Sequence, residues 1–246
     1  MKILVCINSV PDTTSKINFT DDNTKFDTSG VQFVINPHDE YSLTRAMWFK
    51  EKQGASLTVV GVGNQSIEPT LRKALAIGAD NAIRVNTEAT DGFSVAQQLA
   101  EVVKTGEYDV VIAGRESIDY NGGMVPGILA TLLDYSFVNA VNGLEINDNK
   151  ATITREIDGG KEILEADLPI VVGSQKGIVQ ENDLRIPNMR GIMMARKKPL
   201  TVVEPIVAEA ATLSQSFEKP EANAACKIVE TVDELIDLLH NEAKVI

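Results

Sequence analysis

Strand-like and helix-like segments alternate along the first two-thirds of this chain, and that alternation constrains the fold more than any other feature. Four short runs rich in β-branched residues end in glycine or polar residues, and they span Lys2 to Asn8, Leu57 to Gly63, Ala82 to Val85 and Asp109 to Gly114. Strands that alternate with helices predict a doubly wound, mostly parallel sheet. The fourth run is apolar almost throughout, which is typical of a strand buried on both faces.

Helical patterns fill the gaps between these runs. The segment from Asp39 to Lys52 begins with carboxylates, which complement the positive end of a helix dipole. Ser66 is predicted to cap a second helix that closes at Gly78, and Asp91 a third. We therefore expect a Rossmann-like, doubly wound α/β domain over residues 1–200.

The last third changes character. Strands are predicted over Leu144 to Ile146, Ala151 to Ile157 and Glu162 to Val172, joined by the turn segments 147–150 and 158–160. These turns are rich in Asn, Asp and Gly, so an added β-hairpin region is expected.

Residues 201–246 are expected to form a separate C-terminal arm. Its stretch from Glu204 to Ala225 is rich in Ala, Glu, Ser and Pro and has weak periodicity, which predicts an extended segment. The stretch from Thr231 to Ala243 is amphipathic, and Thr231 with Glu234 forms a capping-box pattern. An arm without a core of its own needs a partner surface.

Composition narrows the classes of function. A net charge of −12 over 246 residues disfavours nucleic acid as a partner. Two cysteines and two histidines supply neither a disulfide framework nor a metal-ligand set, so no metal and no catalytic residue is predicted. No apolar run is long enough for a membrane span, and no signal peptide is visible. We expect a cytoplasmic protein, or one of an organelle matrix.

The loop after the fourth predicted strand is the candidate phosphate site. It runs from Gly114 to Val125 and leads into an apolar helix beginning near Ile128. Gly122 and Gly123 let the backbone approach a ligand closely, and a helix start offers unpaired N–H groups to an anion. A plain strand-to-helix connection remains the alternative on this pattern alone.

Other motifs of nucleotide or acid–base chemistry are incomplete. There is no G-x-x-x-x-G-K-[ST] sequence, and the dinucleotide fingerprint that starts at Gly61 has Ser66 where its last glycine belongs. Glu162 and Glu165 lie on a predicted strand and are expected to face solvent rather than form an acid/base pair.

A long motif in the hairpin region carries a family resemblance. The pattern Ile153-x-Arg155-x-x-Asp158-Gly159-Gly160-x-Glu162-x-Leu164, followed by Pro169-x-Val171-Val172, resembles the signature of electron transfer flavoprotein beta subunits. Gly173 departs from it, since the family usually has a small non-glycine residue there. Further family segments recur in order, at Leu4 to Asp12, Asn36 to Glu40, Ala74 to Asp80, Gly114 to Asp119 and Pro187 to Lys198.

The resemblance implies a role in electron transfer and a Rossmann-like fold of the adenine-nucleotide-binding kind. It implies a heterodimer with an alpha subunit that holds most of an FAD, and either AMP or a second FAD, reducible by NADH, in this chain. The nucleotide contacts that it implies are Cys6, Asn36, Pro37, His38, Asp39, Val62, Gly114, Arg115, Glu116, Ser117, Ile118, Asp119, Tyr120, Asn121, Gly122, Gly123, Met124 and Val125. Asn8, Met124 and Pro126 depart from the family pattern, and Pro126 has no N–H to donate.

The same resemblance implies a docking segment for dehydrogenase or quinone-oxidoreductase partners. Its residues are Ile186, Pro187, Asn188, Met189, Arg190, Arg196 and Lys197. An apolar anchor beside basic residues suits an acidic partner surface. A partly buried apolar turn with solvated basic stems is the competing interpretation.

Two further choices stay open. The stretch Arg190 to Met193 is an insertion relative to AMP-binding members, and Tyr120 and Met124 alter the AMP pocket, which favours a second FAD and the electron-bifurcating branch. The other functional class is an adenine-nucleotide-binding module of the universal-stress type, which gives no role to the 158–160 hairpin. A PP-loop adenylating enzyme would need Ser-Gly-Gly where Asn8-Ser9-Val10 stands.

Overall fold

The computed structural model describes residues 1–221 and 225–246, so residues 222–224 of the predicted arm lie outside the described residues. The chain divides into two compact units. Unit 1 comprises Met1–Asn18 and Asp27–Ser214, and unit 2 comprises Phe19–Phe26 and the described part of Gln215–Ile246.

A mixed, mostly parallel sheet forms the centre of unit 1. Within the described residues it has nine strands in the order β11-β10-β9-β12-β8-β1-β6-β7-β13. Neighbours from β9 to β13 along this order are parallel, while β9, β10 and β11 are antiparallel to one another. The strands are β1 (Lys2–Cys6), β6 (Ser56–Val62), β7 (Asn81–Val85), β8 (Val110–Gly114), β9 (Ser136–Asn147), β10 (Lys150–Ile157), β11 (Gly160–Asp167), β12 (Ile170–Ser174) and β13 (Leu200–Val203).

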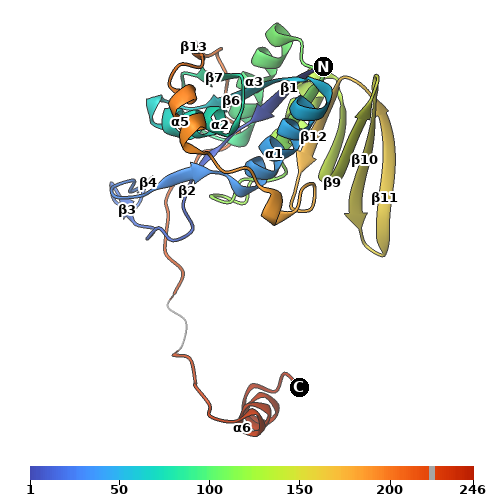
Figure 1. Cartoon of the computed structure of the whole chain (residues 1–246). Coiled ribbons are helices and arrows are strands. Elements are labelled where there is room, and N and C mark those ends of the chain that lie inside the picture. Colours follow the sequence, from blue (N-terminus) through green and yellow to red (C-terminus); the bar gives the residue numbers. More distant parts are fainter. Residues whose placement is uncertain (222–224) are drawn as a thin grey trace. The chain divides into compact units, whose positions relative to one another are not determined.

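Helices cover both faces of the sheet, and this confirms the predicted doubly wound fold (Figure 1). They are α1 (Pro37–Gln53), α2 (Glu68–Ile77), α3 (Gly92–Gly106) and α4 (Val125–Leu133). Alternate residues of β1 enter different cores, because successive side chains of a strand point to opposite faces. Ile3 and Val5 pack with α1 and α2, whereas Leu4 and Cys6 pack with α3 and α4.

Of two predicted helix caps, one is confirmed and the other is wrong. Asp91 caps α3, since its side chain accepts the N–H of Ser94 at 2.8 Å. Ser66 does not cap α2; it lies in a 3-10 turn, η1 (Gln65–Ile67), which Asn64 caps instead. Helix α2 begins after this turn, at Glu68. Pro69 lies in its first turn, where a residue without an N–H is tolerated.

The predicted hairpin region is present, but the structure has one more strand there than was predicted. The run from Glu162 to Val172 is two strands, because Pro169 lies between them and has no N–H for the ladder. Its first part, β11, pairs antiparallel with β10, and its second part, β12, pairs parallel with β8.

Smaller elements complete the two units. Unit 1 has β2 (Ser9–Pro11) paired with β5 (Phe33–Ile35), the turn η2 (Glu181–Asp183) and a short helix, α5 (Met189–Ala195). Unit 2 has the hairpin β3 (Phe19–Thr20) and β4 (Lys25–Phe26), the helix α6 (Val232–Asp237) and the π-helical η3 (Leu238–Ala243). The predicted C-terminal helix is therefore confirmed, and Thr231 caps it.

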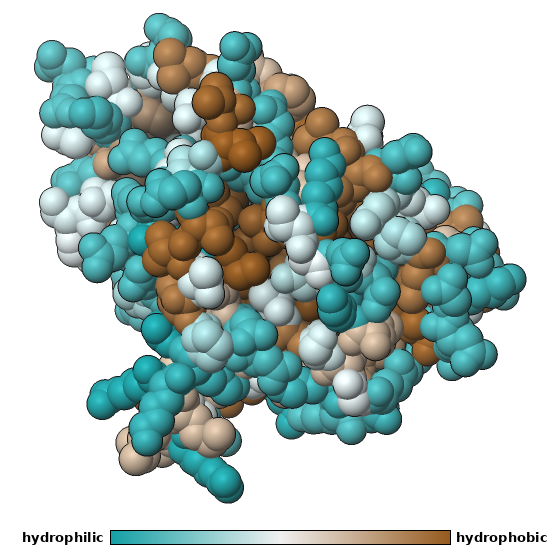
Figure 2. Space-filling view, turned by 90° about the horizontal axis from the view of Figure 1, so that it is seen from above, coloured by the Kyte–Doolittle hydropathy of each residue, from teal (hydrophilic) through white to brown (hydrophobic). Residues whose placement is uncertain are grey.

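The surface carries hydrophobic patches between hydrophilic side chains, as the face in Figure 2 shows. Among the described helices, none is long and apolar enough to cross a membrane. The described residues also contain no cluster of His, Cys, Asp or Glu that could hold a metal ion.

Candidate functional site

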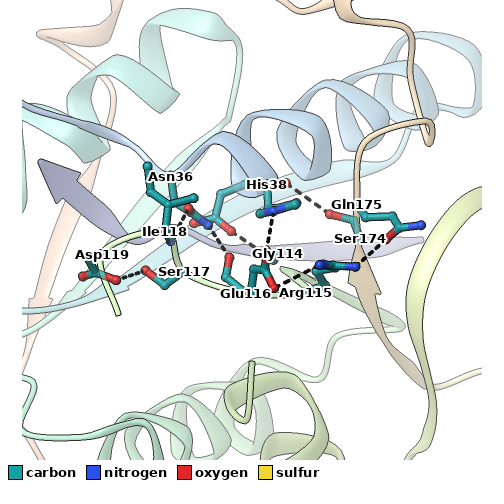
Figure 3. A network of polar contacts seen from close by, with 11 residues as sticks. Asn36, His38, Gly114, Arg115, Glu116, Ser117, Ile118, Asp119, Ser174 and Gln175 are labelled. Atoms are coloured by element: carbon teal, nitrogen blue, oxygen red, sulfur yellow. Dashed lines mark hydrogen bonds and ion pairs between the residues drawn. The ribbon is translucent and has the colours of Figure 1, made fainter. Parts of the chain in front are cut away.

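Polar side chains meet where the carboxyl ends of β1, β8 and β12 face the start of α1 (Figure 3). This edge is where doubly wound sheets bind ligands. Asn36 begins α1 through its carbonyl, which accepts the N–H groups of Asp39 at 2.8 Å and Glu40 at 3.1 Å. Its side chain is thereby left available for contacts outside the helix.

Asp39 joins the first helix to two strand ends. Its carboxylate accepts the N–H of Asn8 at 2.8 Å and the N–H of Gly114 at 2.9 Å. Burial raises the pKa of Asp39 to about 7, although hydrogen bonds from Asn8, Asn36 and Gly114 oppose that rise. A Cβ at Gly114 would overlap the Asp39 carboxylate, so this close approach requires glycine.

The Asn36 side chain fixes the backbone of the loop that follows β8. Its Nδ2 donates to the Glu116 carbonyl at 2.9 Å, and its Oδ1 accepts the N–H of Ile118 at 3.3 Å. Asn8 adds a third contact, since its Nδ2 donates to Ser117 Oγ at 2.6 Å. The strand end, the helix start and the loop therefore form one connected polar unit.

Glu116 is shared by two basic side chains. Its carboxylate lies 3.4 Å from His38 Nε2 and 3.1 Å from Arg115 Nη2. Burial lowers the pKa of His38, while Glu116 raises it and Arg115 lowers it further. His38 Nδ1 and Arg115 Nε are buried without a hydrogen-bond partner among the described residues, which leaves two donors or acceptors unused at this site.

The end of β12 supports the same network. The N–H of Arg115 donates to the Ser174 carbonyl at 2.8 Å, and Arg115 Nη1 donates to Gln175 Oε1 at 3.0 Å. Sequence reasoning missed both Ser174 and Gln175. The signal was available, because they directly follow an apolar strand, and every parallel strand of such a sheet ends at the ligand edge.

The loop closes on itself before α4 begins. The N–H of Ser117 donates to the Gly122 carbonyl at 3.0 Å, and the Ser117 hydroxyl donates to Asp119. The first bond of the helix runs from the N–H of Ile128 to the Met124 carbonyl at 3.1 Å. The N–H groups of Val125 and Gly127 precede it and have no partner within the helix, so they can meet an anion.

A shallow apolar hollow of about 440 Å³ adjoins this loop over α4. Gly123 and Met124 belong to both the loop and the hollow, and its lining is Phe93, Gly123, Met124, Gly127, Ile128, Thr131 and Leu132. Met124 and the nearby Tyr120 are exposed, at 49% and 68%. A flat apolar group next to a phosphate would find contact surface here.

The structure brings most of the predicted nucleotide contacts together. Asn36, His38 and Asp39 contact the segment from Gly114 to Ile118 directly. Cys6 is buried at the end of β1, and burial, followed by the Asp39 charge, raises its pKa well above the ordinary thiol range. Val62 ends the neighbouring strand β6 and is partly buried in the core with α3 and α4, away from the polar network.

The middle of the docking segment forms the short helix α5. Asn188 caps α5 by accepting the N–H of Gly191 at 2.8 Å, and Gly191 packs against the Ala76 carbonyl of α2. Ile186 is 83% exposed, and Met189 and Met193 are also largely exposed. An apolar surface beside Arg190, Arg196 and Lys197 is therefore presented to solvent, rather than a buried turn.

The first part of the arm, residues 204–214, lies along α3. Gln98 forms two hydrogen bonds with the backbone of Ile206, at 2.8 and 3.0 Å. Asp91 accepts the N–H groups of Ala211 and Thr212, at 2.7 and 2.8 Å. We call residues 204–214 the arm base.

Comparison with known proteins agrees with this architecture. The model of the electron transfer flavoprotein domain matches residues 23–208. Electron transfer flavoprotein subunit beta of Syntrophomonas wolfei is 38% identical over 227 residues, which cover 92% of this chain and 88% of its own. The subunit of Bacillus subtilis is 35% identical, and the mitochondrial one of Oryza sativa 32%, both over the full length of each chain. This chain therefore belongs to the electron transfer flavoprotein family, as one of its beta subunits.

Proposed function

We propose that this beta subunit binds an adenine nucleotide with its phosphates at the loop from Gly114 to Val125. The observation that carries the proposal is the set of bonds by which Asn36 and Asp39 hold that loop at the carboxyl end of β8. A fixed backbone leading into a helix start suits phosphate oxygens. The unused His38 Nδ1 and Arg115 Nε offer further polar contacts.

Charge divides the site into two parts. Asp39, Glu116 and Asp119 are acidic, while Arg115 is the one side chain with a permanent positive charge among the predicted nucleotide contacts. Phosphate oxygens are therefore expected at the α4 start, where backbone N–H groups are free, rather than beside the carboxylates. An uncharged adenosine suits the ends of β1 and β6, near Cys6 and Val62.

Family membership implies a heterodimer with an alpha subunit and FAD. Within that frame we favour a second FAD over AMP in the beta subunit, because the apolar hollow over α4 begins at the phosphate loop itself. AMP would leave this hollow without contact, whereas the ring system of FAD would cover it. FAD supplies reversible electron acceptance when bound, with NADH as the donor that this choice favours, and the chain's own residues bind and orient it.

Partner recognition is assigned to the exposed surface of α5 and Ile186. An apolar centre with basic neighbours suits the acidic surface of a dehydrogenase or quinone oxidoreductase. The arm and C-terminal helix are assigned to the alpha subunit, because Val232, Leu235 and Ile236 are exposed in the described part of unit 2. A cytoplasmic location stays a prediction, since one relative is named as mitochondrial.

The phosphate loop is tested by Gly123→Val in the purified heterodimer. A Cβ at Gly123 lies 3.2 Å from the Arg115 carbonyl, so a branched side chain crowds the backbone of the loop. We expect affinity for both AMP and FAD to fall at least tenfold, an effect of about 1.4 kcal/mol. Gly160→Val is the matched control, because its Cβ meets open space in the β10–β11 hairpin. Equal affinities in the two variants reject the assignment of the loop.

A further inference from the structure

The side chain of Asp91 bonds to two parts of the chain at once. One carboxylate oxygen accepts the N–H of Ser94 at 2.8 Å and so caps α3. The other accepts the N–H of Ala211 at 2.7 Å, and the N–H and hydroxyl of Thr212 at 2.8 and 3.2 Å. The helix start and the arm base are therefore held by a single charged group.

The residue after Asp91 contacts the start of α4. A Cβ at Gly92 would lie 2.7 Å from Met124 Cγ and 3.3 Å from Val125 Cγ2, so only glycine fits there without displacing those side chains. Phe93 then lines the hollow together with Gly123 and Met124. Three consecutive residues thus contact the arm base, the first turn of α4 and the apolar hollow.

We infer that Asp91 is a positioning residue that couples the arm base to the nucleotide loop, so that binding of the alpha subunit and of the nucleotide strengthen each other. The inference rests on the proposed function, since it needs a nucleotide at Gly123 to Val125 and an arm that engages the alpha subunit. Moving the arm base shifts Asp91 and with it the α3 start, against which Met124 packs. Coupling of this kind is reciprocal by thermodynamic necessity.

Replacing Asp91 with asparagine separates its two roles, which are capping α3 and holding the arm base. Asn caps a helix as well as Asp does, so Asp91→Asn retains the start of α3. Asn has one acceptor oxygen, and with that oxygen on Ser94 its NH₂ group faces the donors of Ala211 and Thr212. The variant therefore releases the arm base without melting the helix, which an unchanged melting temperature and circular dichroism spectrum verify.

Gln98→Ala is the matched control. It removes the other attachment of the arm base to α3, the pair of bonds to Ile206, about two turns along the helix from Gly92. Gln98 bonds to Ile206 and borders a different hollow, with Val85 and Val203, so its loss should weaken the attachment of the arm base equally in the presence and absence of nucleotide.

The test measures the dissociation constant of the heterodimer on dilution, with the beta site emptied or saturated with AMP. We expect AMP to tighten the wild-type heterodimer at least fivefold. In Asp91→Asn, the ratio of the dissociation constants without and with AMP falls toward one. In Gln98→Ala the heterodimer is weaker, but this ratio is unchanged. Three outcomes overturn the inference while nucleotide still binds. AMP has no effect on the dissociation constant of the wild-type heterodimer, or its effect is undiminished in Asp91→Asn, or the effect falls as much in Gln98→Ala as in Asp91→Asn. A wild-type heterodimer that binds neither AMP nor FAD defeats the proposed function itself.

Discussion

At the scale of single residues, Asp39 is a buried carboxyl that two backbone N–H groups hold in place. Its pKa of about 7 exceeds the ordinary 3.8, so between these values the folded protein binds more protons than the unfolded chain. The free energy of unfolding should therefore fall as pH rises from about 4 to about 7, and this contribution should not change further above that. The variant Asp39→Asn has no carboxyl to titrate at this position, so its stability should lack this pH dependence. Denaturant unfolding of the parent and the variant across this pH range checks the prediction. Parallel pH profiles of their free energies of unfolding would contradict it.

Gly173, the position that departs from the family signature, is explained by its neighbour across the sheet. A Cβ there would overlap Asn139 Oδ1, a buried atom without a hydrogen-bond partner among the described residues. Gly173→Ala should cost about 1–3 kcal/mol of stability through overpacking. Adding Asn139→Ala should recover most of that loss, because the double variant makes room for the methyl group. Additive losses in the two variants would mean that the residues do not share this space.

At the scale of elements, the sequence predicts what repeats along the chain. Short runs of β-branched residues and helical apolar patterns located β1, β6, β7 and β8 and the helices between them, and Asp91 marked the start of α3. Single residues caused the errors: Asn64, and not Ser66, caps the turn before α2, and Pro169 divides one predicted strand into β11 and β12. Contacts between distant segments, such as Arg115 with Gln175 or Asp91 with Thr212, have no periodic signal, because only the folded topology brings them together.

The exposed surface of α5 leads to a prediction about partner docking. Ile186→Ala should slow electron transfer to a partner protein by about tenfold or more, since one anchor at an interface centre can contribute ~2 kcal/mol. Flavin content should not change. Ile163→Ala on β11 is the control, because that side chain is 69% exposed and lies outside the docking segment. Stopped-flow reduction kinetics compare the variants, and equal rates for Ile186→Ala and the parent would contradict the docking role.

At the scale of the whole molecule, a doubly wound domain carries the proposed nucleotide loop at one sheet edge, and the arm base lies along α3. The arm base is bonded to the domain, whereas the C-terminal helix of unit 2 exposes apolar residues. We expect the alpha subunit to bury that surface. The proposed nucleotide loop and the arm base both contact the start of α3, through Gly92 and Asp91, whereas the proposed docking surface lies on α5.

Flavin and nucleotide stoichiometry of the purified heterodimer tests the central claim most directly. Denaturation, chromatography and absorbance identify and count what is released. The account predicts two FAD per heterodimer, one of them reducible by NADH, because the beta subunit offers both a phosphate loop and an adjoining apolar hollow. One FAD with one AMP, and no reduction by NADH, would contradict the choice of FAD. One FAD with no second nucleotide would contradict the binding site at Gly114 to Val125 altogether.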